Sequence, residues 1–387
     1  MITTLTQTKR SASMRMRSTP SETFLKYVAQ CVCVAMMFLS VETSTSVSAA
    51  TRPSAAMVEL GRALFDEPLL GRDGRTRCHS CHNPARAYTD ANERSIGVTG
   101  RRGTRNAPSL VGVESRRFIF WDGRRSSLDA AVLDPLTNPA EMGWPSLSDL
   151  TRELQKHPTI VRRFKAAFPE GAAWATGDQI SKALVAFLGT LTTGTSDFDD
   201  AQAKHVPLPP QAELGRRLFT GAAQCSQCHT LDGDRSFTDE AFHHSSIGNV
   251  SQAEALPTLV ATVASAHFDE LQLGHKILTD AQWASLGRFV VSHRPADIGT
   301  FRTPSLRNVA VTAPYMHDGS IPTLSEAVDH EIYYRGFSNG RPINLSGIER
   351  QALVAFLNTL TDAEYTTSTA RSSHRHSRNS IARGMAP

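Results

Sequence analysis

The feature that most constrains this chain is a motif, Cys-x-x-Cys-His, that occurs twice. The first copy occupies residues 78–82 and the second residues 225–229, so the two copies lie 147 residues apart. Two thiols at this spacing reach the two vinyl groups of one porphyrin, and the histidine that follows is placed to bind the iron. The motif therefore predicts two covalently bound haem c groups. The attachment residues and iron ligands would be Cys78, Cys81 and His82 for the first haem, and Cys225, Cys228 and His229 for the second.

Other sites built on paired cysteines fit this sequence less well. A zinc site normally has its second cysteine pair within about 20 residues, and none follows either motif at that distance. A thioredoxin-like redox pair requires no histidine and lies beside a β-α-β pattern, which is not evident here. A disulfide across two residues would be strained. We therefore expect redox chemistry supplied by haem, and two haems in one chain imply electron transfer between them.

Residues 1–49 have the pattern of a secretory signal peptide. A basic stretch that ends at Lys26 precedes an apolar run over residues 27–41, and small residues at 47–49 offer a cleavage site. An uncleaved membrane anchor is the alternative, but polar residues at positions 30 and 40 dilute the apolar run. We expect export to the periplasm and no stable membrane insertion after cleavage. Export agrees with the attachment of haem c, which in bacteria takes place outside the cytoplasmic membrane.

The distribution of charge argues against a nucleic-acid partner. The formal net charge is +4, but the predicted signal peptide and residues 364–387 each contribute +3, so residues 50–363 carry about −2. A slightly acidic body does not attract a polyanion. Residues 364–387 are rich in Ser, Thr, Arg and His and have no apolar period, so we expect a disordered tail.

Between these ends the chain repeats itself. Segments 59–65 and 213–219, both Glu-Leu-Gly-Arg-x-Leu-Phe, precede the two haem motifs. Segments 183–192 and 352–361 close the two halves and are identical at nine of ten positions. A helix before the haem motif and a closing helix packed on it make the plan of a small cytochrome c domain. We therefore predict a mainly α fold of two cytochrome c-like domains, residues 50–200 and 201–363, each with one haem, the haems facing a shared interface.

Both closing segments have the period of an amphipathic helix. Apolar residues at 180, 184, 187, 188 and 191 would share one face of the first helix, and those at 348, 353, 356, 357 and 360 one face of the second. Ser346 and Glu349 are spaced as a capping box at the start of the last helix. Residues 197–211 include three prolines and are expected to link the two domains.

Four further segments carry a resemblance to a known family. They are Phe-Trp-Asp-Gly-Arg at 120–124, Asn-Pro-Ala-Glu-Met at 138–142, Thr-Pro-Ser-Leu-Arg-Asn at 303–308 and Thr-Ala-Pro-Tyr-Met-His-Asp-Gly at 312–319. In these motifs the chain resembles the bacterial dihaem cytochrome c peroxidases. It is also similar to the related dihaem enzyme that matures the tryptophan-derived quinone of methylamine dehydrogenase. The resemblance covers residues 57–361.

The resemblance implies roles for individual residues. The haem at His82 would be the peroxidatic one, and the haem at His229 would receive electrons. Trp121 would lie between the haems and carry electrons from one to the other. Glu141 would be the acid-base group, because a carboxylate above the iron can take a proton from one oxygen of peroxide and give it to the other.

The resemblance also implies a further cofactor and several partners. Asn106, with the backbone carbonyls of Thr312 and Pro314, would bind one calcium ion, which prefers oxygen ligands. Hydrogen peroxide would be the substrate, and a small cytochrome c or a cupredoxin would donate electrons. Members of the family often form homodimers, so a homodimer is a further expectation, although no residue of the sequence indicates one.

Two positions near the first haem depart from the pattern of the family. Many of its peroxidases keep a histidine on the peroxidatic iron at rest, and Val98 stands at the matching position here. Valine cannot bind iron, so we expect an open iron that needs no reductive activation. A glutamine common in the family is replaced by Ala131, which removes one hydrogen-bonding group from the pocket.

The sixth ligand of the second haem is another departure. The peroxidases use a methionine, and the quinone-maturing enzyme a tyrosine, in the helix after the Tyr-x-His-x-Gly segment. The matching region, 326–336, has no methionine and reads as two residues longer. Tyr333 is the first candidate, with His330 and Met316 as alternatives, and an interpretation in which Tyr333 only packs on the haem edge stays open. A methionine ligand would raise the haem potential, whereas an anionic tyrosinate would lower it.

The sequence therefore predicts a dihaem c-type peroxidase that reduces hydrogen peroxide to water with electrons from a small redox protein. The first alternative is a dihaem oxidase similar to the quinone-maturing enzyme, acting on a partner protein or a small organic substrate through high-valent haem. The second alternative is an electron carrier without catalysis. Val98 and Glu141 argue against the carrier, because they predict a vacant pocket that contains an acid, whereas a carrier needs two shielded, six-coordinate irons.

Overall fold

The computed structural model describes residues 52–171, 173–231, 236–245, 247, 254–338 and 340–366. The predicted signal peptide lies outside these residues, as does the predicted tail beyond residue 366. Helices dominate this part of the chain, which confirms the mainly α prediction, and its strands form one two-stranded sheet. No helix in the described ranges is long and apolar enough to cross a membrane.

The N-terminal half consists of short helices joined by long loops. They are α2 (Ala55–Phe65), α3 (Cys78–Cys81), α4 (Leu128–Ala131), α5 (Asp134–Thr137), α6 (Leu147–Gln155), α7 (Pro158–Ala167) and α8 (Gly177–Leu188). Helix α2 begins where the Ser54 side chain accepts a hydrogen bond from the Met57 N–H. Helix α8 begins with a capping box of Thr176 and Gln179. The first haem motif forms α3 and its C-terminal cap.

The C-terminal half repeats this plan and adds a small sheet. Its elements are α9 (Asp197–Lys204), α10 (Pro210–Thr220), β1 (Phe242–His244), α11 (Leu256–Ser265), α12 (Glu270–Thr279), α13 (Ala281–Ser285), α14 (Phe289–Ser292), β2 (Thr300–Arg302), α15 (Leu324–Ser338) and α16 (Gly347–Asn358). The strands are antiparallel, with His243 opposite Phe301. The predicted capping box of Ser346 and Glu349 is confirmed at the start of α16.

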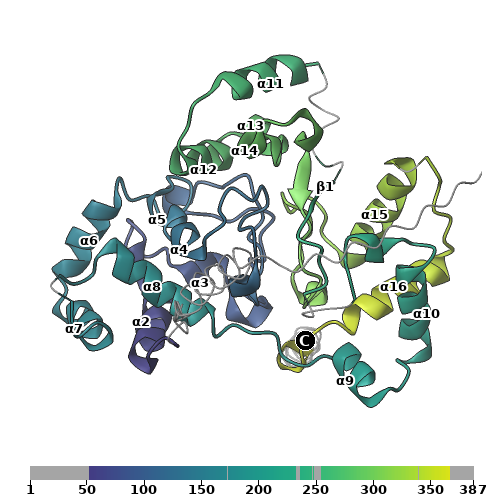
Figure 1. Ribbon diagram of the computed structural model, residues 1–387, viewed down its shortest axis with the longest axis horizontal. Coiled ribbons are helices and arrows are strands. Elements are labelled where there is room, and N and C mark those ends of the chain that lie inside the picture. The colour runs from purple at the N-terminus through teal and green to yellow at the C-terminus, as the bar shows by residue number, and fades with distance from the viewer. Residues whose placement is uncertain are drawn as a thin grey trace, which may run out of the picture. The chain divides into compact units, whose positions relative to one another are not determined.

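The internal repeat takes the form of two crossing helix pairs, α2 with α8 and α10 with α16. Figure 1 shows the two pairs on opposite sides of β1. A glycine lies at each crossing, where the helix backbones touch. A Cβ on Gly61 would come within 1.9 Å of the Ala183 carbonyl oxygen, and a Cβ on Gly215 would come equally close to that of Ala352. Each repeated Glu-Leu-Gly-Arg segment therefore contains the glycine that its crossing requires.

A pair of phenylalanines packs one helical turn after the glycine of each crossing. The Phe65 ring packs on Phe187 with centroids 5.3 Å apart, and the Phe219 ring packs on Phe356 with centroids 5.1 Å apart. These rings belong to two separate apolar cores, one in each half. The two-domain division at residue 200 stays a prediction, since the described residues from Pro53 onward form one compact unit.

Two details predicted for the helices are wrong. Helix α9 lies within the segment expected to be a linker, and its Phe198 packs on Phe237 and Phe356 in the C-terminal core. Ile348 is 71% exposed rather than buried. The reason is that Ile348 precedes Leu353 by five residues, a spacing that does not return to the same face of a helix.

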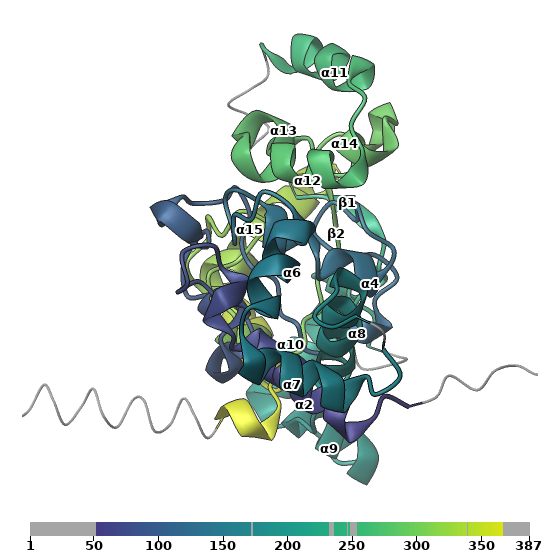
Figure 2. The same cartoon turned by 90° about the vertical axis from the view of Figure 1, so that its left-hand side faces the viewer.

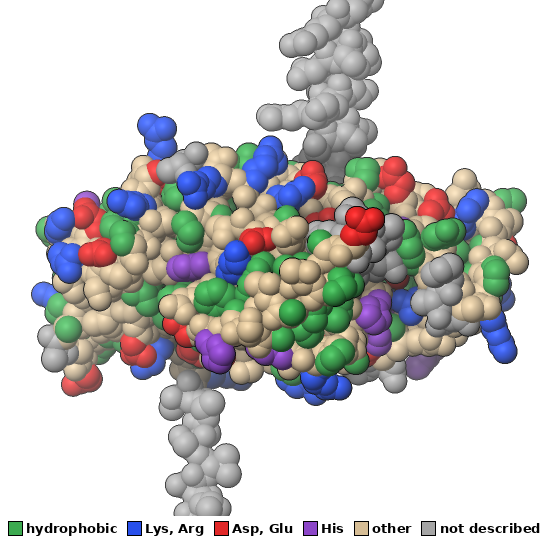
Figure 3. Space-filling view, turned by 90° about the horizontal axis from the view of Figure 1, so that it is seen from above, with side chains coloured by type: hydrophobic (Ala, Val, Ile, Leu, Met, Phe, Trp, Pro, Cys, Tyr) green, Lys and Arg blue, Asp and Glu red, His purple; other side chains and the backbone are tan. Residues whose placement is uncertain are grey.

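In chain order, helices α11–α14 follow β1 and precede β2. They have an apolar core of their own, centred on Ile277, Leu286 and Phe289. Figures 1 and 2 both show this group at one end of the described body. Seen from that side, apolar and histidine side chains lie among charged ones (Figure 3). The group is attached to the N-terminal half, because Arg105 donates a hydrogen bond to the Ala284 carbonyl.

Candidate functional site

A cavity of about 420 Å³ is lined by residues of both helix pairs and by both Cys-x-x-Cys-His motifs. The six predicted attachment residues all line it: Cys78, Cys81, His82, Cys225, Cys228 and His229. None of the four cysteines forms a disulfide. Burial raises the pKa of the Cys78, Cys81 and Cys225 thiols to about 12. Protonated thiols are poor nucleophiles, which argues against a dithiol redox pair.

Both motif histidines are oriented by the same kind of hydrogen bond. His82 Nδ1 lies 2.9 Å from the Tyr88 carbonyl oxygen, and His229 Nδ1 lies 3.0 Å from that of Phe237. Because a carbonyl can only accept, each Nδ1 donates and each Nε2 keeps its lone pair. Burial lowers the pKa of both imidazoles, which favours the neutral form. The residues present therefore fit two haem groups held through sulfur and ligated through Nε2.

Two serines anchor the carbonyl segments that orient these histidines. Ser109 Oγ donates to the Ala87 carbonyl at 2.6 Å, and Ser305 Oγ donates to the Ser236 carbonyl at 2.5 Å. Residues 87 and 236 directly precede the residues whose carbonyls accept from the histidines. No role was predicted for these serines from the sequence, but a signal exists: each lies in a Pro-Ser-Leu triplet, at 108–110 and 304–306.

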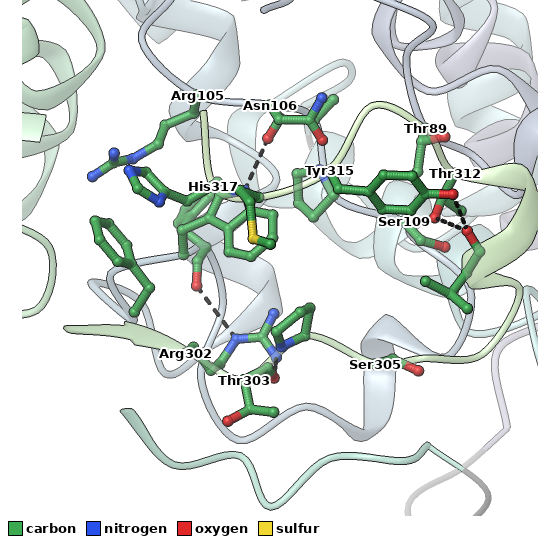
Figure 4. Close-up of a pocket in the computed structure, with 18 of the residues that line it drawn as sticks. Thr89, Arg105, Asn106, Ser109, Arg302, Thr303, Ser305, Thr312, Tyr315 and His317 are labelled. Carbon is green, nitrogen blue, oxygen red and sulfur yellow. Dashed lines mark hydrogen bonds between the residues drawn. The ribbon is translucent and has the colours of Figure 1, made fainter. Parts of the chain in front are cut away.

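Trp121 lines the cavity and is hydrogen-bonded to both halves. Its Nε1 donates to the Asn106 carbonyl at 2.9 Å, and its own carbonyl accepts from the Arg302 N–H of β2 at 2.8 Å. The Asn106 N–H in turn donates to the His317 carbonyl at 2.9 Å, and both residues are labelled at the cavity in Figure 4. Trp121 thus lies where the two halves meet.

Glu141 lines the same cavity, and its charge acts on Cys78 and Cys81 of the first motif. Burial raises the pKa of Glu141 to about 7, although the Arg124 guanidinium opposes the shift. Within the described residues, no side chain donates a hydrogen bond to its carboxylate. Arg124 also lines the cavity and is held by both oxygens of Asp122, at 3.1 and 3.0 Å. A carboxyl group that titrates near pH 7 can accept and return a proton at neutral pH.

The loop next to Glu141 lines the cavity with Ser95, Gly97 and Gly103, and not with Val98. Val98 is 5% exposed and packs over Gly143, and its N–H donates to the Glu141 carbonyl at 2.7 Å. Gly97 does line the cavity, and a Cβ there would come within 2.1 Å of the Ala140 carbonyl oxygen. The loop thus packs on the backbone beside Glu141 and lines the cavity with Ser95, Gly97 and Gly103. Ala131 lines the cavity from α4.

The structure does not place Tyr333 at the cavity, contrary to the prediction. Tyr333 is 67% exposed on the outer face of α15 and is not among the lining residues. His330 is turned elsewhere too, with Nε2 3.0 Å from the Ser245 carbonyl oxygen. Of the three predicted candidates for the sixth ligand, only Met316 lines the cavity. The prediction for Tyr333 depended on counting residues along α15, whereas the phase of the helix determines which residues face inward.

The three predicted calcium ligands, Asn106, Thr312 and Pro314, all line the cavity. The Asn106 side-chain amide donates to the carbonyls of Asn92 and Glu93, at 3.3 and 3.2 Å. Since Nδ2 is used in this way, Oδ1 remains as an acceptor for a cation. Oxygen donors suit calcium, and the ion itself stays a prediction.

Comparisons with known proteins agree with this geometry. The model of the di-haem cytochrome c peroxidases matches residues 55–206. The methylamine utilization protein MauG of Methylorubrum extorquens is 32% identical over 315 residues, which covers 78% of this chain and 77% of the relative. The chain belongs to the di-haem cytochrome c peroxidase family. Membership makes it an oxidoreductase and implies two c-type haems.

Other family members resemble the chain over a similar range. The cytochrome c551 peroxidase of Nitrosomonas europaea is 31% identical over 317 residues, covering 81% of this chain and 83% of the relative. Among solved structures, a MauG-like protein associated with microbial copper homeostasis matches with a TM-score of 0.66 and 29% identity. That match covers 80% of this chain and 90% of the other. The predicted family is thereby confirmed.

Proposed function

We propose that this family member is an exported, periplasmic peroxidase that reduces hydrogen peroxide to water with electrons from a small cytochrome c or a cupredoxin. The observation that carries the proposal is Glu141, a half-buried carboxyl group whose pKa is raised to about 7, in the cavity that also contains the first haem motif. The adjacent loop contributes Ser95, Gly97 and Gly103 to the lining, and Val98 is not among the lining residues. An electron carrier would need neither an acid nor an open position.

The proposed chemistry divides between the haems and the residues of the chain. Haem bound at each motif would supply the iron and the capacity to store and transfer electrons. His82 and His229 would ligate through Nε2. Glu141 would accept a proton from one oxygen of the peroxide and return it to the other, so that the departing oxygen leaves as water. Arg124 places a fixed positive charge beside that carboxyl group and opposes the rise of its pKa.

Trp121 would pass electrons between the halves. Its indole N–H and its carbonyl are bonded to Asn106 and Arg302, so the ring is held at the boundary. A calcium ion at Asn106, Thr312 and Pro314 would stabilise the same boundary. Because the relatives include MauG as well as peroxidases, the alternative reaction is oxidation of a partner protein or a small organic molecule, with peroxide as oxidant.

Consumption of hydrogen peroxide by the haem-loaded protein, with reduced cytochrome c as donor, tests the proposal. Glu141→Gln is expected to lower turnover by about 100- to 10,000-fold, the usual contribution of a positioned acid-base group. Glu59→Gln, which changes an exposed carboxyl group on α2, is the matched control and should retain activity. Haem-loaded wild-type protein that consumes no peroxide would reject the proposal. Activity with an organic reductant but none with cytochrome c would favour the alternative.

A further inference from the structure

Helix α15 turns one face toward the cavity. Its lining residues recur three and four positions apart, as one face of a helix requires: Leu324, Ala327, Val328, Glu331, Ile332 and Arg335. On this face Glu331 is the one side chain with a lone pair that iron can accept, because the others are aliphatic or, at Arg335, a cation. Tyr333 lies outside this face and is largely exposed.

Glu331 lies beside the second haem motif. The Glu331 carboxylate is paired with Arg335 at 3.3 Å, and Arg335 reaches the Cys228 sulfur at 3.7 Å. The Glu331 charge also acts on Cys225 and on the imidazole of His229. The carboxylate and the motif histidine therefore share the same part of the cavity.

Met316, the remaining predicted candidate, is tied to the boundary between the halves. The next residue, His317, accepts a hydrogen bond from the Asn106 N–H, and Asn106 is the residue that holds Trp121. The loop that contains Met316 is therefore fixed on the Trp121 side of the cavity. Glu331 is the group of α15 that accompanies His229.

We propose that the Glu331 carboxylate is the sixth ligand of the haem attached at Cys225 and Cys228. Carboxylate oxygen is a hard donor that proteins use to bind iron. Because it is anionic, it would stabilise ferric over ferrous iron and give this haem a lower potential than a methionine ligand would. The inference rests on the haem attachment within the proposed function, but it does not depend on peroxide being the substrate.

Electron paramagnetic resonance and redox titration of the haem-loaded ferric protein test the proposal. Glu331→Met should convert the second haem to a low-spin, methionine-ligated form with a higher midpoint potential. Glu331→Gln should alter the same signal and raise the same potential, because the negative charge is removed. The signal of the first haem should stay as in wild type. Tyr333→Phe, on the outer face of the same helix, is the matched control and should change neither haem.

Two results would overturn the inference: unchanged spectra and potentials in both Glu331 variants, or loss of the wild-type signal of the second haem in Met316→Leu. Peroxide consumption is measured on the same samples, because it reports on the proposed function instead. If the wild-type protein consumed no peroxide and Glu331→Met still changed the signal of the second haem, the peroxidase function would be rejected. The assignment of Glu331 as a ligand would be supported. Mass spectrometry of the peptide that contains Cys225 and Cys228 shows whether haem is attached there. A peptide without haem would overturn both the proposed function and the proposed ligand.

Discussion

In the N-terminal half the carboxyl group at the cavity, Glu141, has no ion-pair partner among the described residues, whereas in the C-terminal half Glu331 is paired with Arg335 at 3.3 Å. The surrounding cradle is nevertheless the same in both halves. Each has a glycine at a helix crossing, a haem motif, and a serine that anchors the carbonyl segment above the motif histidine. Since the cradle relies on backbone contacts, the side chains that face the cavity are free to differ. One plan can therefore hold two sites with different tasks.

The halves also differ directly after the Pro-Ser-Leu triplet. Val111 follows the first triplet and lies in a small apolar cluster with Ala87 and Tyr365. Arg307 follows the second and is 3% exposed, paired with Asp199 at 2.7 Å and Asp362 at 3.3 Å. The C-terminal half thus uses buried charge where the N-terminal half uses apolar packing.

Replacing the buried charge of Arg307 with an apolar side chain should give the largest loss of stability among these variants. Arg307→Val, which gives the C-terminal half the residue type of the N-terminal half, should cost about 3–5 kcal/mol, because two buried carboxylates lose their partner. Adding Asp199→Asn and Asp362→Asn should recover part of the loss. Urea denaturation followed by circular dichroism measures both changes. A cost below about 1 kcal/mol would mean that the ion pairs are dispensable.

The role of Glu141, the cavity carboxyl group of the N-terminal half, can be tested through the pH dependence of the rate. With a pKa of about 7, Glu141 is mostly protonated below pH 7 and cannot accept a proton there. The rate of the peroxide reaction should therefore rise with pH, about tenfold per unit below pH 7, and level off above it. Stopped-flow measurement between pH 5 and 9 tests this, and Glu141→Gln should flatten the profile. A wild-type profile without an inflection near pH 7 would remove Glu141 from the proton transfer.

The two helix crossings should respond alike to an added methyl group. Gly61→Ala and Gly215→Ala each bring a Cβ to 1.9 Å from a carbonyl of the partner helix, and each should cost about 1–3 kcal/mol. Gly347→Ala, at the start of α16 where nothing lies near the added carbon, is the matched control and should cost little. Unequal losses of stability in the two variants would show that the two crossings differ in how they accommodate the added carbon, although their geometry is the same.

The two anchoring serines should have small and separate effects. Ser109→Ala and Ser305→Ala each remove two hydrogen bonds, one donated to a carbonyl and one accepted from the N–H of Val111 or Arg307. Each bond is worth about 1 kcal/mol. Because each serine anchors the residue just before the carbonyl that orients one histidine, each variant should shift the potential of the haem in its own half and leave the other haem as it was. Redox titration measures the two potentials in each variant. If either substitution moved both potentials, the halves would be coupled through these segments.

Much of this arrangement could be predicted from local sequence. The haem motifs, the capping box of α16 and the repeated helices all depend on residues within one or two turns of each other. The prediction for Tyr333 was wrong because the inward face of a helix depends on what packs against it. The prediction for Ile348 was wrong because a five-residue spacing from Leu353 does not keep one helix face. Helix α9 was assigned to a linker because the segment 197–211 contains three prolines. These prolines, at 207, 209 and 210, follow the helix and do not interrupt it. Tyr365 is 5% exposed and packs near Val111, so the ordered body continues past residue 363.

The sequence by itself predicted where the two haems would attach and determined which family the chain belongs to, because both depend on short motifs whose chemistry needs no partner. Only the tertiary structure decided what surrounds each haem motif. Trp121 reaches both halves through Asn106 and Arg302, which are 196 residues apart in the chain. Glu331, rather than Tyr333, faces the cavity because α15 packs on α16 with one particular side inward. Which side that is depends on long-range packing, and no local pattern in residues 324–338 encodes it.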